Sequence, residues 1–71
     1  MSNHHTYKML ELVGSSPVSP QDAIENAIAE CAKSVDHLDW FEVVQMRGHI
    51  NDGKVAHYQV ILKVGFKLKD S

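Results

Sequence analysis

Apolar and polar residues alternate along the last third of the chain with the period of a β-strand. The apolar positions are every second residue: Ala56, Tyr58, Val60, Leu62, Val64, Phe66 and Leu68. The residues between them are mixed in character, and most are polar or charged. This pattern predicts a half-buried strand that turns one entirely apolar face toward a core.

A different period predicts a helix from Pro20 to Val35. Apolar residues recur there at helical spacing and form one stripe, made of Ile24, Ala27, Ile28, Cys31, Ala32 and Val35. Ser19 suits the N-cap position, Pro20 is tolerated at the first helical position, and Asp22 is a candidate to reach back to the cap. We therefore expect an amphipathic helix that lies on the apolar face of a sheet.

Two further segments have the composition of strands. The segment from Thr6 to Val13 is rich in β-branched, aromatic and aliphatic residues, and Gly14 is expected to end it. The second strand is expected from Trp40 to Ile50, and Asn51-Asp52-Gly53 after it is a strong hairpin signal. The predicted order is β-α-β-β. The fold class is α+β, with a three-stranded antiparallel sheet partly wrapping one amphipathic helix.

The length of the chain predicts association. The chain has 71 residues, and we expect a single domain, residues 1–71, in which residues 1–5 are frayed. A chain this short buries only about 60% of the surface that its unfolded form exposes, and small domains usually compensate with disulfides, metals or association. Cys31 is the only cysteine, and the five histidines form no zinc-binding spacing. The last strand could also reach some 45 Å at ~3.3 Å per residue, which is long for a compact monomer.

The charge balance argues against several classes of partner. The formal net charge is −2, with no basic run, which disfavours nucleic acid or an anionic membrane as the main partner. No apolar stretch approaches the ~20 residues of a membrane span. Residues 1–8 are too polar for a signal peptide. We expect a cytoplasmic protein that binds neither nucleic acid nor membrane.

Polar residues on the face away from the helix are candidates for ligand binding. A three-residue hairpin loop would set Gln45 opposite Gln59 and Arg47 opposite His57. The amide of Gln59 suits the mixed donors and acceptors at the edge of a heterocycle, and the planar fork of Arg47 suits phosphate. Trp40, the only tryptophan, could serve as a stacking platform. Together these residues suit a flat, phosphate-bearing cofactor.

Simpler interpretations stay open at this point. Trp40 could equally be a core or interface residue, because most tryptophans are structural, and Gln59 and Arg47 could be solvated surface residues. Simple alternation also places Trp40 on the helix side of its strand, on the face opposite Gln45 and Arg47. A bulge near the start of the strand, or a site assembled from different subunits, would reconcile these positions. No nucleophile with a base beside it and no paired acid indicates an enzyme.

Four segments of the chain, taken together, strongly resemble the dodecins, a family of small flavin-binding proteins. The segments are Leu38-Asp39-Trp40-Phe41-Glu42-Val43, Arg47-Gly48, Tyr58-Gln59-Val60 and Lys63-Val64-Gly65-Phe66. The similarity extends from Tyr7 to about Leu68. No segment is decisive alone, and the combination carries the resemblance.

The resemblance implies a hollow homododecamer that binds flavins in pairs at two-fold interfaces between subunits. Isoalloxazine rings stack there against tryptophans of symmetry-related chains, and a glutamine bonds the polar edge of the ring. The matching residues in this sequence are Trp40 for stacking, Gln59 for the ring edge, Arg47 for the phosphate of FMN and Gln45 for a position near the flavin tail. Such an interface site favours assembly from different subunits as the explanation for the position of Trp40.

The implied function is storage and sequestration of flavin (FMN, riboflavin or FAD), without turnover. A ring clamped between aromatic side chains has no free face for a substrate, and Trp40 beside an excited flavin could donate an electron and quench it. Some bacterial members of the family also bind coenzyme A, and Lys67 and Lys69 fall near that region. Two alternatives stay open. One is a flavin-dependent reductase, and the other is a purely structural oligomeric interaction module in which Trp40 only packs an interface.

Overall fold

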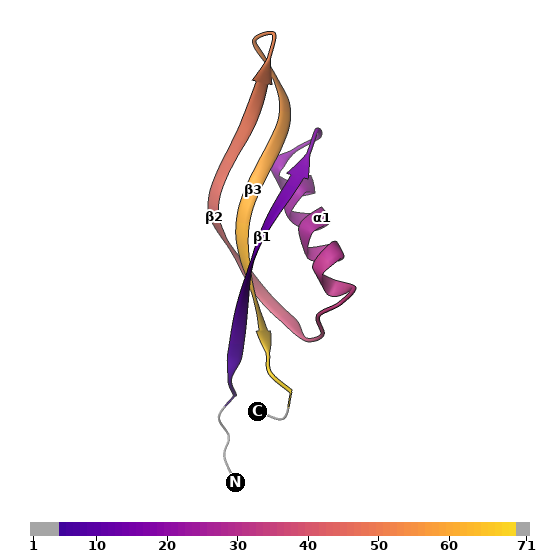
Figure 1. Cartoon of the computed structure of the whole chain (residues 1–71), viewed down its shortest axis with the longest axis vertical. Coiled ribbons are helices and arrows are strands. Elements are labelled where there is room, and N and C mark those ends of the chain that lie inside the picture. Colours follow the sequence, from indigo (N-terminus) through magenta and orange to yellow (C-terminus); the bar gives the residue numbers. More distant parts are fainter. Residues whose placement is uncertain (1–4, 70–71) are drawn as a thin grey trace.

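The computed structural model describes residues 5–69. Its elements are β1 (Tyr7–Ser16), α1 (Pro20–Ala32), β2 (Leu38–Asn51) and β3 (Lys54–Lys67). All strand pairs are antiparallel, and the sheet order β1-β3-β2 places the last strand in the middle. Figure 1 shows α1 against one face of this sheet and the β2–β3 hairpin extending beyond the helix. The predicted β-α-β-β order and the α+β fold class are confirmed. Of residues 1–5, which we expected to be frayed, residues 1–4 lie outside the described residues.

α1 begins at the predicted residue. Ser19 is the N-cap, its Oγ accepts a hydrogen bond from the backbone N–H of Asp22 at 3.0 Å, and Pro20 opens the helix. The carboxylate of Asp22, expected to reach back to the cap, instead accepts a hydrogen bond from Ser16 Oγ at 2.6 Å. Ser16 is 1% exposed and ends β1. This bond therefore ties the start of the helix to the end of the first strand.

α1 ends at Ala32, three residues before the predicted end at Val35. The carbonyl of Cys31 accepts hydrogen bonds from the backbone N–H groups of both Ser34 and Val35, which closes the last turn. His37 then adopts a left-handed backbone with φ 66°. The chain reverses there and enters β2. The apolar stripe in the sequence therefore extends to Val35, beyond the end of the helical backbone at Ala32.

β1 continues past Gly14, which corrects the expectation that this glycine ends the strand. The reason lies in packing. A Cβ on Gly14 would stand 2.2 Å from the carbonyl oxygen of Ala23 and 3.1 Å from the Cβ of Ala27. The backbone of β1 therefore packs closely against the helix at Gly14, and only a residue without a side chain permits that approach.

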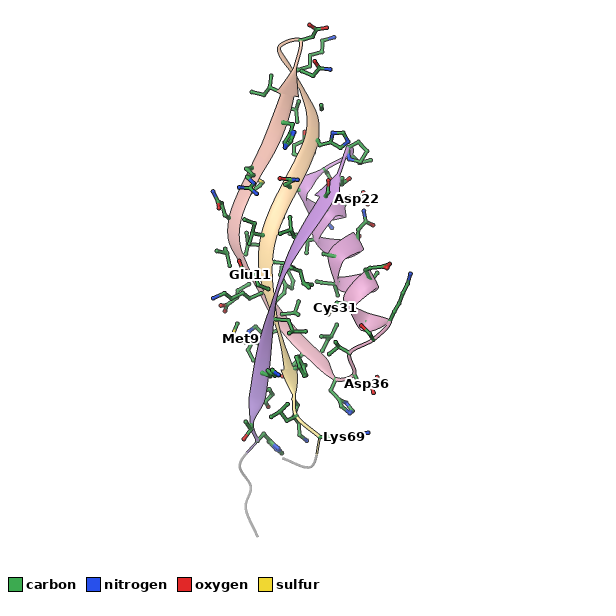
Figure 2. The ribbon with its side chains drawn as sticks, in the orientation of Figure 1. Met9, Glu11, Asp22, Cys31, Asp36 and Lys69 are labelled. Carbon is green, nitrogen blue, oxygen red and sulfur yellow. The ribbon has the colours of Figure 1, made fainter. Side chains whose placement is uncertain are left out.

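The core lies between α1 and the central strand. Its fully buried residues are Ala23 on the helix and Val60, Leu62 and Val64 on β3, the apolar face that the alternation predicted. We call the face of the sheet that α1 covers the inner face and the opposite one the outer face. Figure 2 shows Met9 and Glu11 of β1 on the outer face, directed away from α1.

The helix packs on β1 and β3, and the inner side of β2 is left open. Phe41, Val43 and Met46 pair with inner-face residues of β3, yet they are 47%, 49% and 59% exposed. The structure is also long for its size, with extents of 60 × 21 × 13 Å and a radius of gyration of 15.0 Å. A compact domain of this length has a radius near 11 Å. Both features are typical of a protomer that is completed by other copies.

The β2–β3 hairpin turns over two residues, not three. Asp52 and Gly53 have φ values of 55° and 73°, the pair of positive values that a type I′ turn requires. A register shift follows between His49 and Ile50. The pairing is thereby displaced by two residues from the one we expected, which keeps Gln45, Arg47 and Gln59 on the predicted face but changes their partners.

Candidate functional site

A bulge in β2 brings Trp40 onto the outer face. The register runs from Val43, opposite Leu62, directly to Gln45, opposite Ile61, and leaves Val44 without a partner. One extra residue in a strand moves every side chain that precedes it to the opposite face of the sheet. Trp40 therefore shares the outer face with Gln45 and Arg47, whereas simple alternation placed it on the other side. The bulge lies in the middle of the strand, within one protomer.

Trp40 lies flat across a glycine of the central strand. It pairs with Gly65 of β3, and three atoms of its six-membered ring stand 2.3–2.5 Å from where a Cβ of that glycine would be. Tyr7 of β1 meets the indole edge-on, with ring centroids 5.4 Å apart and an interplanar angle of 67°. The side chain of Trp40 is 39% exposed. Trp40 thus rests on the sheet and is not buried in the protomer core.

The sequence reasoning did not anticipate Tyr7 or Gly65 as parts of this arrangement. A signal for Gly65 existed, because a glycine inside a strand commonly marks the close approach of another group. Tyr7 carried no comparable signal. Tyr7 lies opposite Lys67 on the other side of β3, and it contacts Trp40 because the indole extends across Gly65.

Arg47 and Gln59 form the second part of the site. They lie directly opposite each other on β2 and β3, and Arg47 Nε donates a hydrogen bond to Gln59 Oε1 at 3.2 Å. This corrects the expected pairing of Arg47 with His57 and of Gln45 with Gln59. Gln45 is opposite Ile61 and exposed. The bond occupies the acceptor oxygen of the Gln59 amide from one side and leaves its NH₂ group as the available donor.

Within one protomer the two parts of the site stay apart. Gly65, which Trp40 covers, and Gln59 are six positions apart on β3, about 20 Å at ~3.3 Å per residue. That distance exceeds the length of a three-ring heterocycle. This separation favours a site to which different copies of the chain supply Trp40 and Gln59.

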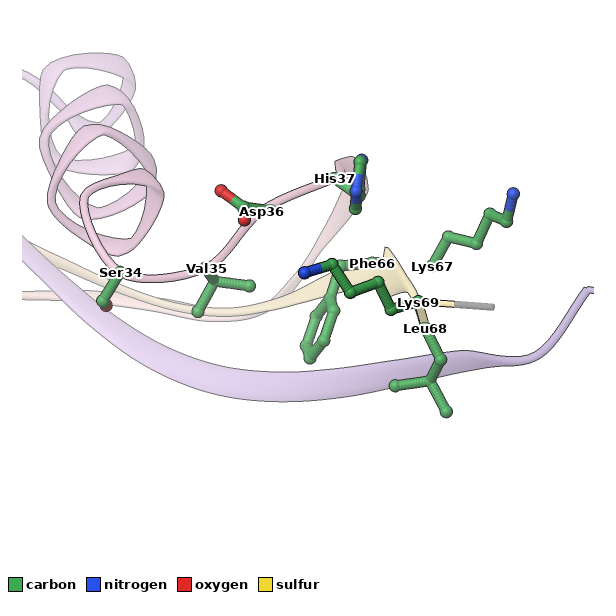
Figure 3. A pocket seen from close by; sticks show the side chains of 8 residues that line it. All are labelled: Ser34, Val35, Asp36, His37, Phe66, Lys67, Leu68 and Lys69. Carbon is green, nitrogen blue, oxygen red and sulfur yellow. The ribbon is translucent and has the colours of Figure 1, made fainter. Parts of the chain in front are cut away.

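A hollow of about 260 Å³ lies at the end of the sheet remote from the hairpin. Its lining comes from the loop after α1 and from the end of β3: Ser34, Val35, Asp36, His37, Phe66, Lys67, Leu68 and Lys69. Figure 3 shows Lys69 reaching over Phe66 toward the loop, while Lys67 points away. The two lysines of the expected coenzyme A region therefore do not converge.

Within residues 5–69 no helix combines the length and the apolar character that crossing a membrane requires. The described residues also contain no group of three or more His, Cys, Asp or Glu side chains placed to hold a metal ion. The candidate residues of the outer face supply an aromatic surface, an amide and a guanidinium.

Comparison with known proteins gives one consistent result. A family model described as Dodecin matches residues 6–69. The chain is 48% identical to the dodecin of Thermus thermophilus over 65 residues, which cover 92% of this chain and 94% of that protein. It is 27% identical to the calcium dodecin of Mycobacterium tuberculosis over 63 residues, which cover 89% of each chain.

Solved structures agree. The dodecin of Streptomyces coelicolor has a TM-score of 0.90 with 52% identity and full coverage of both chains. The dodecin of Streptomyces davaonensis has a TM-score of 0.90 with 49% identity, and the match covers 97% of this chain and 100% of that one. Dodecins are binding proteins and not enzymes, and flavin binding is typical of them. The match over residues 6–69, with a relative 48% identical along nearly its whole length, makes this chain a member of the dodecin family.

Proposed function

We propose that this protein stores and sequesters flavin, with FMN as the main ligand, at contacts between the subunits of a homododecamer. The observation that carries the proposal is the placement of Trp40. Its indole lies across Gly65 on the outer face and is 39% exposed. A rigid aromatic surface held flat on a sheet is suited to stack against a planar ring.

The other residues divide the remaining parts of the ligand between them. The NH₂ group of Gln59, whose oxygen accepts the bond from Arg47, would donate to the acceptors at the polar edge of the flavin ring. The terminal nitrogens of Arg47 would bind the phosphate of FMN. Gln45, on the same face and exposed, would contact the flavin tail.

Assembly is part of the proposal. Trp40 and Gln59 of one protomer are about 20 Å apart along β3, so a flavin ring would take its stacking surface from one copy and its edge contacts from another. The open inner side of β2 and the elongated shape of the protomer support association. Flavin binding is therefore expected only in the assembled protein.

Stacking favours retention of flavin over turnover. Each aromatic pair adds about 0.5–1.5 kcal/mol beyond the burial of area, and several such contacts with the edge bonds would support submicromolar affinity. A ring enclosed between indoles has no free face for a substrate. Trp40 in contact with an excited flavin would donate an electron and quench its fluorescence, which would dissipate absorbed light.

The test is size-exclusion chromatography with an absorbance spectrum of the eluted peak, followed by titration of FMN, riboflavin and FAD fluorescence. We expect a large oligomer that quenches bound flavin. Trp40→Ala should weaken binding at least about tenfold, the equivalent of 1.4 kcal/mol, and restore the fluorescence of the flavin that still binds. Val13→Ala, which removes an exposed apolar side chain from the same face, is the matched control. An oligomer that binds none of the three flavins would overturn the proposal and favour a purely structural module.

Coenzyme A stays a prediction from the resemblance alone. Lys67 and Lys69 are its suggested contacts, and their different directions at the hollow near Phe66 add no support (Figure 3). Titration of coenzyme A into the flavin-free oligomer would test it directly.

A further inference from the structure

Two histidines stand directly opposite each other on neighbouring strands. His49 of β2 pairs with His57 of β3, and both are exposed. Side chains of opposite residues in an antiparallel pair share one face, with Cβ atoms about 4.5–5.5 Å apart. The two imidazoles therefore leave the sheet side by side, near the hairpin. The proposed flavin site uses neither of them.

This spacing suits two nitrogens that bind the same metal ion. Zinc binds histidine nitrogen at about 2.0–2.1 Å, so two nitrogens on one ion lie about 3 Å apart. Rings that start from Cβ atoms about 5 Å apart can converge to that distance by ordinary side-chain rotation. Two positions along the same face Arg47 lies opposite Gln59, and its Nε donates a hydrogen bond to Gln59 Oε1.

We propose that His49 and His57 form a binding site for a divalent transition-metal ion such as Zn²⁺, Ni²⁺ or Cu²⁺. Each histidine would supply one ring nitrogen, and water would fill the remaining positions. Imidazole nitrogen selects these metals, whereas Ca²⁺ and Mg²⁺ prefer oxygen ligands. Because no third His, Cys, Asp or Glu joins the pair among the described residues, the ion would keep open positions for an outside ligand.

The site would also clamp the hairpin. The β2–β3 hairpin extends beyond the helix (Figure 1), and residues near its tip, such as Ile50 and Val55, are 76% and 54% exposed. A metal ion that joins His49 to His57 would link the two strands in the native state only. Binding to the native state alone raises the temperature of unfolding.

The experiment is calorimetric titration of Zn²⁺ and Ni²⁺ into the full-length oligomer, with Ca²⁺ as the control ion. His4 and His5 are adjacent in the sequence and could bind the same metals, so the parent of this experiment and all its variants carry His4→Ala and His5→Ala. His49→Ala and His57→Ala should each lower affinity at least about tenfold, since loss of even an outer partner of a metal ligand costs about ten- to a hundredfold. His37→Asn is the matched control, because Asn tolerates the left-handed backbone of that exposed position.

A second readout counts the ligands. Electron paramagnetic resonance of bound Cu²⁺ should show two equivalent nitrogens in the parent and one in either single variant. His49→Gln and His57→Gln, which keep a polar side chain of similar reach, guard against a loss that comes from misfolding, and each must elute as the parent does. The proposal is overturned if the protein that carries both His49→Ala and His57→Ala binds Zn²⁺ as the parent does. It is also overturned if the parent binds none of Zn²⁺, Ni²⁺ and Cu²⁺ at millimolar concentration.

Discussion

Arg47 Nε donates a hydrogen bond to Gln59 Oε1 over 3.2 Å, between residues that lie directly opposite each other on β2 and β3. The bond uses the nitrogen of the guanidinium that is nearest the chain. The two terminal nitrogens stay available for an anion. One arginine can therefore orient the Gln59 amide and attract a phosphate at the same time.

Arg47→Ala should weaken FMN binding more than riboflavin binding. Hydrogen bonds to a charged group contribute about 1.5–3 kcal/mol, and ordinary ones about 0.5–1.5 kcal/mol. FMN would lose the phosphate contact, whereas riboflavin would lose only the orientation of the Gln59 amide. Fluorescence titration of both flavins measures the difference. Arg47→Lys is the control, because lysine keeps the charge without the planar fork. Equal losses for the two flavins would remove the phosphate role.

Gly65→Ala should displace the indole of Trp40 and reduce flavin affinity while the protein stays folded. The new Cβ would stand 2.3 Å from two atoms of the indole ring, and the tryptophan, being 39% exposed, can move outward. The expected loss approaches that of Trp40→Ala, with recovered fluorescence of bound flavin. Lys63→Ala, at the adjacent position of the same face of β3, should bind flavin nearly as the parent does. Unchanged affinity in Gly65→Ala would show that the flat placement of Trp40 is not required.

Gly14→Ala should destabilise the fold itself. Its Cβ would stand 2.2 Å from the backbone oxygen of Ala23, and a backbone atom can yield only if the helix shifts. Overpacking of this kind costs about 1–3 kcal/mol. Urea unfolding at one fixed protein concentration measures the change, because the stability of an oligomer depends on concentration. Ser15→Ala, next in sequence and exposed, should stay within about 0.5 kcal/mol of the parent.

Met46→Lys should release smaller species from the oligomer. Met46 lies on the inner side of β2, where it is 59% exposed in the protomer. A charge buried there by a neighbouring copy would lack a partner and would oppose assembly. Size-exclusion chromatography with light scattering gives the mass. Val18→Lys, in the loop before α1 and 71% exposed, is the control. A Met46→Lys protein of parental mass would exclude this surface from the subunit contacts.

The elements of the fold were predictable because each has its own period. The alternation through Val60, Leu62 and Val64 identified the buried face of β3. The start of the helix was also predicted correctly, since Ser19 caps it by accepting a hydrogen bond from the backbone N–H of Asp22. Asp52 and Gly53 marked the turn. These signals are local, so a single sequence carries them.

The arrangement of the site was less predictable because it depends on register. A two-residue turn and a shift after His49 changed the partner of Gln59 from Gln45 to Arg47. The bulge at Val44 has no local signature, since valine is as common in regular strands as any residue. Gly14 was misread for a related reason. Ala23 of the helix, which leaves no room for a side chain at Gly14, is nine residues away in the sequence. The two residues come close only in the folded chain.

The unpaired Val44 makes the count of residues in β2 as important as their identity. Trp40 and Gln45 are five positions apart, so strict alternation would place them on opposite faces, and the bulge brings both to the outer face. Deleting one residue between them would leave four positions and keep both side chains on the outer face of a regular strand. Inserting one residue while the bulge is kept would instead turn the indole toward the layer occupied by α1, so a homologue could keep the tryptophan, the glutamine and the arginine and still lose its ligand through one inserted codon. Spacing across this strand is the quantity to inspect when a relative is tested for the same activity.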